Sequence, residues 1–347
     1  MKMHLRIKQH FLLISAIVVT VALTAGMYYK AYAWGFWGHK RINRMAVFTL
    51  PPAMFSFYKK HIEFLTEHAV DPDKRRYASA DEAPRHYIDL DHYPANERDS
   101  IPLFWNDAVK KYSEDTLKAY GIVPWHVVRQ LNMLTNAFKE KNINHILNYS
   151  ADLGHYIADA HVPLHTTENY NGQLTNQHGI HGFWESRLPE LNGESYDYFL
   201  GRAKYVAHPQ PEIWKVVHSS HAAVDTVLKF EAALSNQFPA DQKYVVEQRG
   251  ATVVTTYSKA FSDAYDKMLD GMVEKRMRAS IIAVGSFWYT AWINAGQPAL
   301  DNLQFYVETE AEKNQREAED KMWSTGKAPA NIKGHADWEF FLFNSLK

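Results

Sequence analysis

Apolar residues recur at three- and four-residue spacing along most of the chain, which is typical of amphipathic helices. Strict alternation of apolar and polar residues, which would predict strands, is scarce. The Pro-, Gly- and Asn-rich stretches fall between the periodic segments. The pattern therefore predicts an all-α, multi-helix fold. The predicted helices span residues 40–50, 53–67, 123–141, 143–160, 212–237, 255–295 and 300–320.

The longest periodic segment, 255–295, contains Gly271 and Gly285. Because glycine weakens a helix interior, we expect two helices or one bent helix there. The chain has no internal repeat and no low-complexity linker, which favours a single domain over residues 34–310. A polar, charge-rich extension, which we expect to be partly mobile, follows over residues 311–347.

The N-terminal segment has the three parts of a secretory signal peptide. These parts are the basic residues Lys2, Arg6 and Lys8, an apolar run over 11–25, and the small-residue site Ala31, Tyr32 and Ala33. We predict that residues 1–33 are cleaved on export to the periplasm or the medium, which would make Trp34 the amino terminus. The alternative is an uncleaved membrane anchor, since residues 11–29 carry no charge and are long enough to cross a bilayer.

Composition narrows the chemistry that the chain can perform. The chain has no cysteine, so disulfides and thiolate metal ligands are excluded, and a metal must be held by nitrogen and oxygen atoms. Without residues 1–33 the chain has 34 basic and 39 acidic residues, a formal charge of −5. This charge argues against a broad basic surface for nucleic acid.

One short stretch is rich in histidine and carboxylate side chains. His155 and Asp159 lie four residues apart, which places them on one face of a helix. His181 and Glu185 repeat this spacing. A proline after the first pair should end its helix, so that His165 leaves it in a new direction. Imidazole and carboxylate are the ligands of hydrolytic zinc sites, so the stretch predicts a polynuclear zinc centre.

Three nearby histidines are weaker candidates. His161 follows Asp159 by two residues and points to another side of the helix, so we interpret it as structural or as a neighbour of the ligands. His178 is an alternative to His181, and His92 is interpreted as a neighbour.

Four features together resemble the zinc-dependent phospholipase C and S1/P1 nuclease superfamily. They are Trp34 at the expected amino terminus, Gly38-His39 close behind it, His155-x3-Asp159-x5-His165, and His181-x3-Glu185. The resemblance covers roughly residues 34–189 in ordered motifs, and it implies a helical fold of the phospholipase C/P1 nuclease type with three zinc ions. Many fungal and plant nucleases of this family carry disulfides, from which this cysteine-free chain departs.

The resemblance also implies how the ligands are shared. One zinc would take the amine and carbonyl oxygen of Trp34, with His39 and Asp159. Another would take His165, His181 and Glu185. The remaining zinc would take His155, the bridging Asp159, and an aspartate and a histidine from upstream.

The upstream pair is sought around residues 71–89. The family places a histidine, often followed by tyrosine, shortly after the aspartate, so Asp71 with His86 fits best. Asp73 is the alternative ligand.

The implied chemistry is hydrolysis of a phosphodiester. Two zinc ions bridged by Asp159 would depress the pKa of a shared water, and the resulting hydroxide would attack phosphorus. Asp71 would orient or deprotonate this water, so Asp71 and Asp159 are the predicted catalytic residues.

Two pairs of residues are predicted to contact substrate. Lys74 and Arg75, followed by Arg76, would clamp a phosphate, or else form a solvated basic run. Phe36 and Trp37 would stack on a base or an ammonium group, or else fill the core.

The motifs divide between two substrate classes. Glu185 and the His155-Tyr156 pair resemble the phospholipase side of the family, whereas Trp184 and the Asp-x-His-x-Pro-Leu-His run resemble the nuclease side. We expect a secreted, monomeric phospholipase C-like enzyme without an obligate protein partner. A single-strand nuclease is the alternative, and a non-catalytic zinc-binding protein and a carboxylate di-iron protein are further ones.

Overall fold

The computed structural model describes residues 35–249, 252–301 and scattered positions between 303 and 321. The predicted signal peptide, Trp34 and almost all of the C-terminal extension lie outside these residues. No helix among the described residues is long and apolar enough to cross a membrane.

The fold is all-α, as the apolar spacing predicts. The first half of the described chain contains α2 (Phe36–Ala46), α3 (Pro52–Lys60), α4 (Ile62–Glu67), α5 (Asp71–Arg75), α6 (Trp105–Tyr112), α7 (Glu114–Tyr120), α8 (Val123–Glu140) and α9 (Ile143–Ala160). The second half contains α10 (Ile180–Gly182), α11 (Leu188–Asn192), α12 (Pro209–Ala222), α13 (Val224–Gln237), α14 (Lys259–Met268) and α15 (Met272–Asn294). Within the described residues the sheet is limited to one antiparallel hairpin, β1 (Tyr244–Arg249) and β2 (Thr252–Tyr257).

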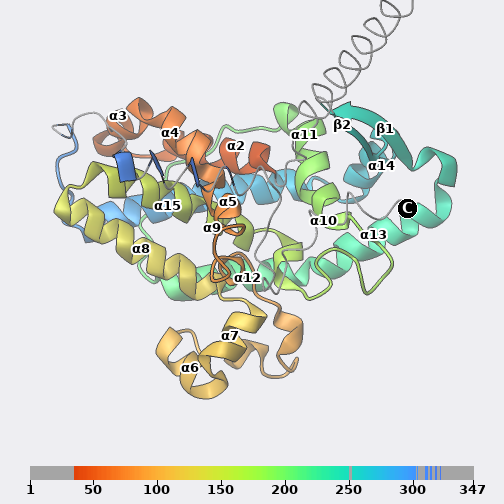
Figure 1. Ribbon diagram of the computed structural model, residues 1–347, viewed down its shortest axis with the longest axis horizontal. Coiled ribbons are helices and arrows are strands. Elements are labelled where there is room, and N and C mark those ends of the chain that lie inside the picture. The colour runs from red at the N-terminus through yellow and green to blue at the C-terminus, as the bar shows by residue number, and fades with distance from the viewer. Residues whose placement is uncertain are drawn as a thin grey trace, which may run out of the picture.

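The molecule is elongated, with α8, α9 and α15 running along its length (Figure 1). α6 and α7 form a lobe that projects from the middle of one long side, and the β1–β2 hairpin lies with α14 at one end. Helix α9 contacts α8, α15 and α2, so it lies at the centre of the core.

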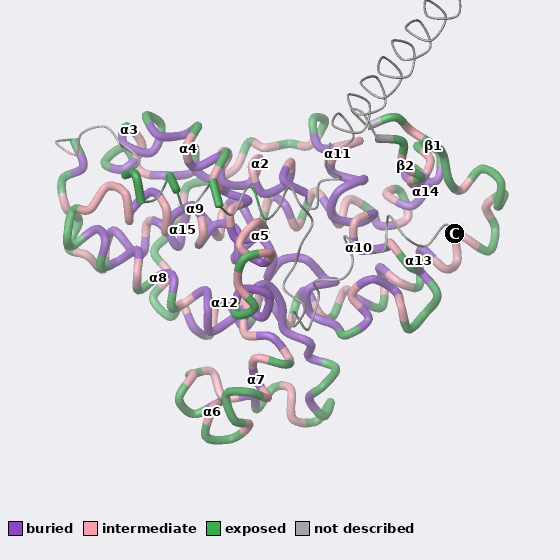
Figure 2. Tube along the Cα trace, viewed as in Figure 1, coloured by how far each residue is buried: buried purple, intermediate pink, exposed green. Residues whose placement is uncertain are grey.

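Helix α9 is buried because it lies at the centre of the core. Every residue from 153 to 160 is buried (Figure 2). The helix begins at Asn142, whose side chain accepts a hydrogen bond from His145 N at 3.1 Å. It ends at Ala160. Val162, just before Pro163, has an extended backbone, so the proline stops the helix as predicted. The polar side chains of its last two turns are therefore held away from water.

Helices α2 and α9 approach each other closely at a glycine. A Cβ atom at Gly154 would lie 2.0 Å from Asn43 Oδ1, so only glycine fits there. Asn43 Nδ2 donates to Ala151 O at 3.1 Å and to Leu65 O at 3.3 Å, which fastens α2 to α9 and α4. This contact sets the N-terminal turns of α2 beside the C-terminal half of α9.

Several predicted helices are divided in the structure. The 53–67 segment breaks at His61 between α3 and α4, and the 212–237 segment breaks at Ala223 between α12 and α13. The start of the 255–295 segment is strand, and α6 and α7 are short helices that the periodicity did not predict.

Candidate metal centre

Several elements bring histidine and carboxylate side chains to one buried region. His39 comes from α2, Asp73 from α5, His155 and Asp159 from α9, His165 from η6 (Pro163–Thr166), His181 from α10 and Glu185 from the π-helical turn η7 (Phe183–Arg187), and His86 follows η3 (Ala83–Arg85). All of them are buried. They form three groups whose ligand atoms lie within 4.8 Å of one another: His39, His155 and Asp159; Asp73, His86 and His155; and His165, His181 and Glu185.

The Asp159 carboxylate lies where the three groups meet. Its Oδ1 lies 3.3 Å from His39 Nε2 and 3.9 Å from His165 Nε2. Its Oδ2 lies 2.9 Å from His86 Nδ1 and 3.2 Å from His155 Nε2. Because its two oxygens face different histidines, this carboxylate has the arrangement needed to bridge two cations.

The second group joins three separate elements. Asp73 Oδ1 lies 3.7 Å from His155 Nε2 and 3.8 Å from His86 Nδ1. The two histidine nitrogens lie 3.1 Å apart. His86 therefore faces the centre with Nδ1, whereas His155 faces it with Nε2.

The third group is built on a π-helical turn. Glu185 Oε2 lies 3.0 Å from His181 Nε2 and 3.4 Å from His165 Nε2. The two residues lie four apart, as the sequence indicates, but Glu185 belongs to the π-helical turn η7 rather than to a regular α-helix. Such turns are frequent at functional sites.

Backbone hydrogen bonds fix the orientation of two rings. His155 Nδ1 donates to Ala69 O at 2.8 Å, and His165 Nδ1 donates to His86 O at 2.7 Å. With the proton on Nδ1, the Nε2 lone pair of each ring faces the carboxylates, as a metal ligand requires.

The donor set fits zinc. Zinc bonds of about 2.0–2.2 Å to nitrogen and oxygen place the ligand atoms of a tetrahedral site roughly 3.3–3.6 Å apart. The nitrogen–oxygen separations within the groups run from 3.0 to 3.8 Å, so each group can contract or expand slightly around one ion. Buried carboxylates also require a compensating cation.

The pKa values indicate the same need for positive charge. Burial lowers the pKa of His155, but the carboxylates of Asp159 and Asp73 outweigh burial and raise it to about 9. Burial raises the pKa of Glu185, but His181 and His165 outweigh burial and lower it to about 2. The carboxylates thus stay ionised and attract positive charge, from protonated histidines or from metal ions.

The structure brings Asp73, the alternative ligand, to the centre rather than the preferred Asp71. Asp71 Oδ2 accepts a hydrogen bond from His68 Nδ1 at 2.5 Å, and its Oδ1 lies 3.2 Å from Lys74 Nζ. Two positions along a helix correspond to about 200° of rotation, so only one of the two aspartates can face α9. Helix α5 presents Asp73.

The basic run after Asp73 is divided among different partners. Lys74 pairs with Asp71, and Arg75 Nη2 donates to Asp152 Oδ2 at 2.7 Å. Arg76 is buried, and its Nη1 lies 3.7 Å from Asp73 Oδ1. Of the three cations, Arg76 is the one that lies beside a group of candidate ligands, whereas Lys74 and Arg75 pair with other carboxylates.

The two aromatic residues of α2 are engaged in internal packing. Phe36 is buried against Val70. Trp37 lies against Gly193, where an added Cβ atom would be 2.1 Å from the indole ring, and the Arg41 guanidinium lies 5.0 Å from its ring centre. These contacts favour a structural role over the expected contact with substrate.

The remaining candidates from the sequence lie apart from the three groups. His161 is buried, and its Nδ1 donates to Ile157 O at 2.7 Å. His92 stacks on Tyr120, and His178 is exposed. Trp34 lies outside the described residues, so its role as a ligand stays a prediction.

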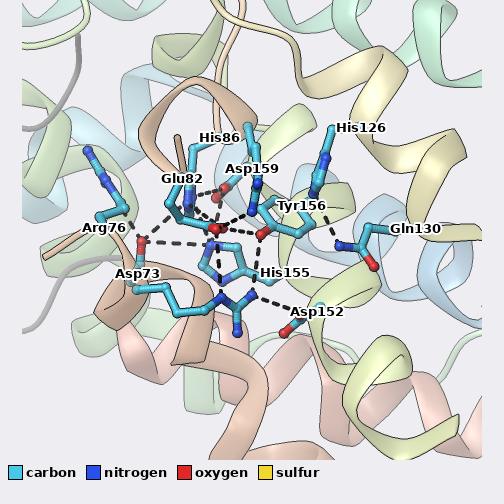
Figure 3. A network of polar contacts seen from close by, with 12 residues as sticks. Asp73, Arg76, Glu82, His86, His126, Gln130, Asp152, His155, Tyr156 and Asp159 are labelled. Atoms are coloured by element: carbon cyan, nitrogen blue, oxygen red, sulfur yellow. Dashed lines mark hydrogen bonds and ion pairs between the residues drawn. The ribbon is translucent and has the colours of Figure 1, made fainter. Parts of the chain in front are cut away.

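Sequence reasoning missed a polar network beside His86 (Figure 3). Glu82 is buried and lies one helical turn before His86, and Tyr156 OH donates to its carboxylate. Asp152 and Arg75 extend the network. The i,i+4 spacing of Glu82 and His86 is visible in the sequence, but the partners come from distant segments.

Comparisons with known proteins give limited information. Neither a family model nor a curated protein matches the sequence. Among solved structures, the chain is similar to the alpha toxin of Clostridium absonum, with a TM-score of 0.42 and 13% sequence identity. The match covers 76% of this chain and 65% of the toxin chain, which is less than two thirds of the toxin's length. A likeness at this level identifies neither a family nor an activity.

Proposed function

We propose that this chain is a zinc-dependent phosphodiester hydrolase of the phospholipase C type that binds three zinc ions. The observation that carries the proposal is the convergence of three buried histidine–carboxylate groups on Asp159. Histidines and carboxylates with only a structural role are not gathered in this way, because burying several carboxylates together is costly without cations.

Each group would hold one ion. His39 and Asp159 would bind the first, with Trp34 completing the site. Asp73, His86 and His155 would bind the second, with Asp159 shared between the two. The third would be held by His165, His181 and Glu185. Bound zinc would supply positive charge for phosphate oxygens and lower the pKa of a water toward neutrality.

Residues of the chain would position the substrate around these ions. Asp73 Oδ1 faces His86 and His155, and the second carboxylate oxygen of Asp73 would accept the proton of the attacking water. Arg76 lies 3.7 Å from this carboxylate, so its guanidinium would bind a non-bridging phosphate oxygen. We propose Arg76 for the role that the sequence assigned to Lys74 and Arg75.

The substrate class rests on the third group. Its carboxylate ligand, Glu185, resembles the phospholipase side of the family, and Glu185 Oε2 lies 3.0 Å from His181 Nε2. The internal packing of Phe36 and Trp37 favours a structural role over stacking on a nucleic-acid base. We therefore propose a phospholipid as substrate, with diacylglycerol and a phosphorylated head group as products.

We further propose that the catalytic domain spans residues 34–310 and is exported by cleavage of residues 1–33. Because an amide nitrogen is a poor zinc ligand, the site would be complete only when cleavage exposes the amine of Trp34. The extension over 311–347 has no proposed function.

The test is hydrolysis of phosphatidylcholine vesicles, single-stranded DNA and RNA, side by side, by protein that begins at Trp34 and is loaded with zinc. We expect release of phosphorylated head group, and we expect Asp159→Asn to reduce it by several orders of magnitude. Cleavage of nucleic acid alone would assign the nuclease activity instead. Zinc binding without any hydrolysis would indicate a non-catalytic zinc protein.

A further inference from the structure

A buried polar network adjoins one of the three groups without belonging to it (Figure 3). The Tyr156 hydroxyl donates to Glu82 Oε1, and Arg85 Nη1 donates to Glu82 Oε2 at 2.5 Å. Arg75 Nε lies 3.7 Å from Glu82 Oε2, while Arg75 Nη2 donates to Asp152 Oδ2 at 2.7 Å and to the Tyr156 hydroxyl at 3.4 Å. Two carboxylates and two guanidinium groups thus meet around one tyrosine.

Members of the network are close in sequence to the ligands of the second group. Arg75 lies two residues after Asp73 on α5. Glu82 lies four residues before His86, and Tyr156 directly follows a ligand on α9. The network therefore ties together the three segments that carry Asp73, His86 and His155.

Glu82 also lies against a ligand directly. Its Oε1 lies 3.6 Å from His86 Nε2, and the exposed fractions of the two side chains are 1% and 0%. The other ring nitrogen, His86 Nδ1, lies 2.9 Å from Asp159 Oδ2. The ring thus presents one nitrogen to the centre and the other to a carboxylate. A carboxylate beside Nε2 favours the proton on that atom, which leaves the Nδ1 lone pair directed at the centre.

A gain in the stability of the folded protein does not account well for such a network. Replacing a buried ion cluster by apolar side chains is often neutral or stabilising, because desolvation offsets much of the Coulomb attraction. Orientation of a metal ligand is a better reason, since outer partners of ligating histidines fix both the tautomer and the direction of the ring.

We propose that Glu82 is a positioning residue, held by Tyr156 and Arg75, that fixes the tautomer and orientation of His86 for the second zinc ion. The inference rests on the proposed zinc centre. It assigns Arg75 to the support of this site rather than to phosphate binding.

Glu82→Gln tests the inference, because it keeps the shape of the side chain and removes its charge. Zinc affinity is measured on the protein that begins at Trp34, by competition with a chromogenic chelator. We expect one of three ions to bind about 10- to 100-fold more weakly. In the cobalt-substituted protein, we expect the visible absorption of one site to change while the other two stay as in the wild type.

Glu231→Gln is the matched control. Glu231 is equally buried, at 1% exposed, and is bonded to Gln177, Ser235 and Lys243, none of which is a candidate ligand. If Glu82→Gln fails to fold, Tyr156→Phe replaces it, since this variant removes only the hydroxyl that holds Glu82. We expect the same selective loss, smaller in size.

The outcomes separate the inference from the proposed function. Selective weakening of one ion in the Glu82 or Tyr156 variant, with Glu231→Gln unchanged, supports the positioning role. Wild-type affinity for all three ions in the Glu82 variant overturns it, and so does an equal loss in the Glu231 variant. A wild-type protein that binds no zinc overturns the proposed function itself, which the Glu82 comparison alone cannot do.

Discussion

Both carboxylate oxygens of Asp159 lie close to histidine nitrogens. Burial raises its pKa, but His155 and His165 outweigh burial and hold the pKa well below its usual range. An ionised, buried carboxylate whose two oxygens face different histidines is a strong cation ligand. At the scale of single residues, this side chain is the one that lies near members of all three groups.

Two aspartates at the start of α5 differ in their relation to the proposed site. Asp73 belongs to it, whereas Asp71 contacts His68 and Lys74. Asp73→Asn should remove one zinc ligand and the proposed proton acceptor, so we expect loss of one zinc ion per chain and of nearly all hydrolysis. Asp71→Asn should cost only the local contacts to His68 and Lys74 and keep the zinc. Both are measured by metal content and initial rates on the same preparations. If Asp71→Asn is the more damaging variant, the ligand assignment is reversed.

Residue spacing predicted the histidine–carboxylate pairs of the centre. It did not predict that Asp73, rather than Asp71, faces the centre. His155 with Asp159 and His181 with Glu185 are pairs within one short segment, so their convergence follows from helical geometry. The choice of Asp73 depends on how α5 is rotated against α9. That rotation is fixed by tertiary packing, which a single sequence does not reveal.

The two glycines of the longest predicted helix have different roles. Gly271 has a φ of +70° and precedes α15, so it separates α14 from α15, as expected for a break. Gly285 lies inside the continuous helix α15, and an added Cβ atom there would lie 2.0 Å from Thr49 Oγ1. Composition alone cannot tell a helix break from a close helix contact.

Gly285→Ala should therefore destabilise the protein although alanine is the better helix former. Alanine gains about 1 kcal/mol of helix propensity, whereas overpacking costs about 1–3 kcal/mol, and the 2.0 Å approach indicates the upper part of that range. We expect a net loss of about 1–2 kcal/mol in urea unfolding.

Two variants control this measurement. Gly201→Ala meets no atom within 4 Å and should leave stability nearly unchanged. Adding Thr49→Ala to Gly285→Ala should recover part of the loss, because it removes the clashing hydroxyl. A Gly285→Ala protein as stable as the wild type would show that Gly285 is not in tight contact with Thr49.

The hairpin was missed because its strands are short and because the end of β2 was included in the predicted helix over 255–295. Val245, Val246, Val253 and Val254 give it a β-branched character, and Gly250 separates the two valine pairs in the sequence. Enrichment in β-branched residues on both sides of a glycine was the available signal. The fold class was unaffected, since the rest of the described chain is helical.

At the scale of the whole molecule, the candidate ligands join segments that are far apart in the chain. They extend from α2 to η7, and α9 holds two of them at the centre of the core. A metal bound by such a set stabilises the folded state by its binding free energy, because the unfolded chain does not preserve the site.

Removing zinc should therefore lower the melting temperature. An ion present at 1,000 times its dissociation constant contributes about 4 kcal/mol, so loss of three ions should lower the melting temperature by roughly 10 °C or more. The measurement is calorimetry before and after treatment with a chelator, with zinc restored as the reversal. Asp159→Asn should respond much less, since its centre is already impaired. An unchanged melting curve after verified removal would indicate a peripheral site.

The count of metal ions in the purified protein tests the central claim most directly. Protein that begins at Trp34 is equilibrated with zinc, freed of excess metal by gel filtration, and analysed for its elements against its measured concentration. The three buried groups predict close to three zinc ions per chain, and the Asp159→Asn variant should hold fewer. A chain that retains no zinc, a single zinc, or iron in its place would contradict the account.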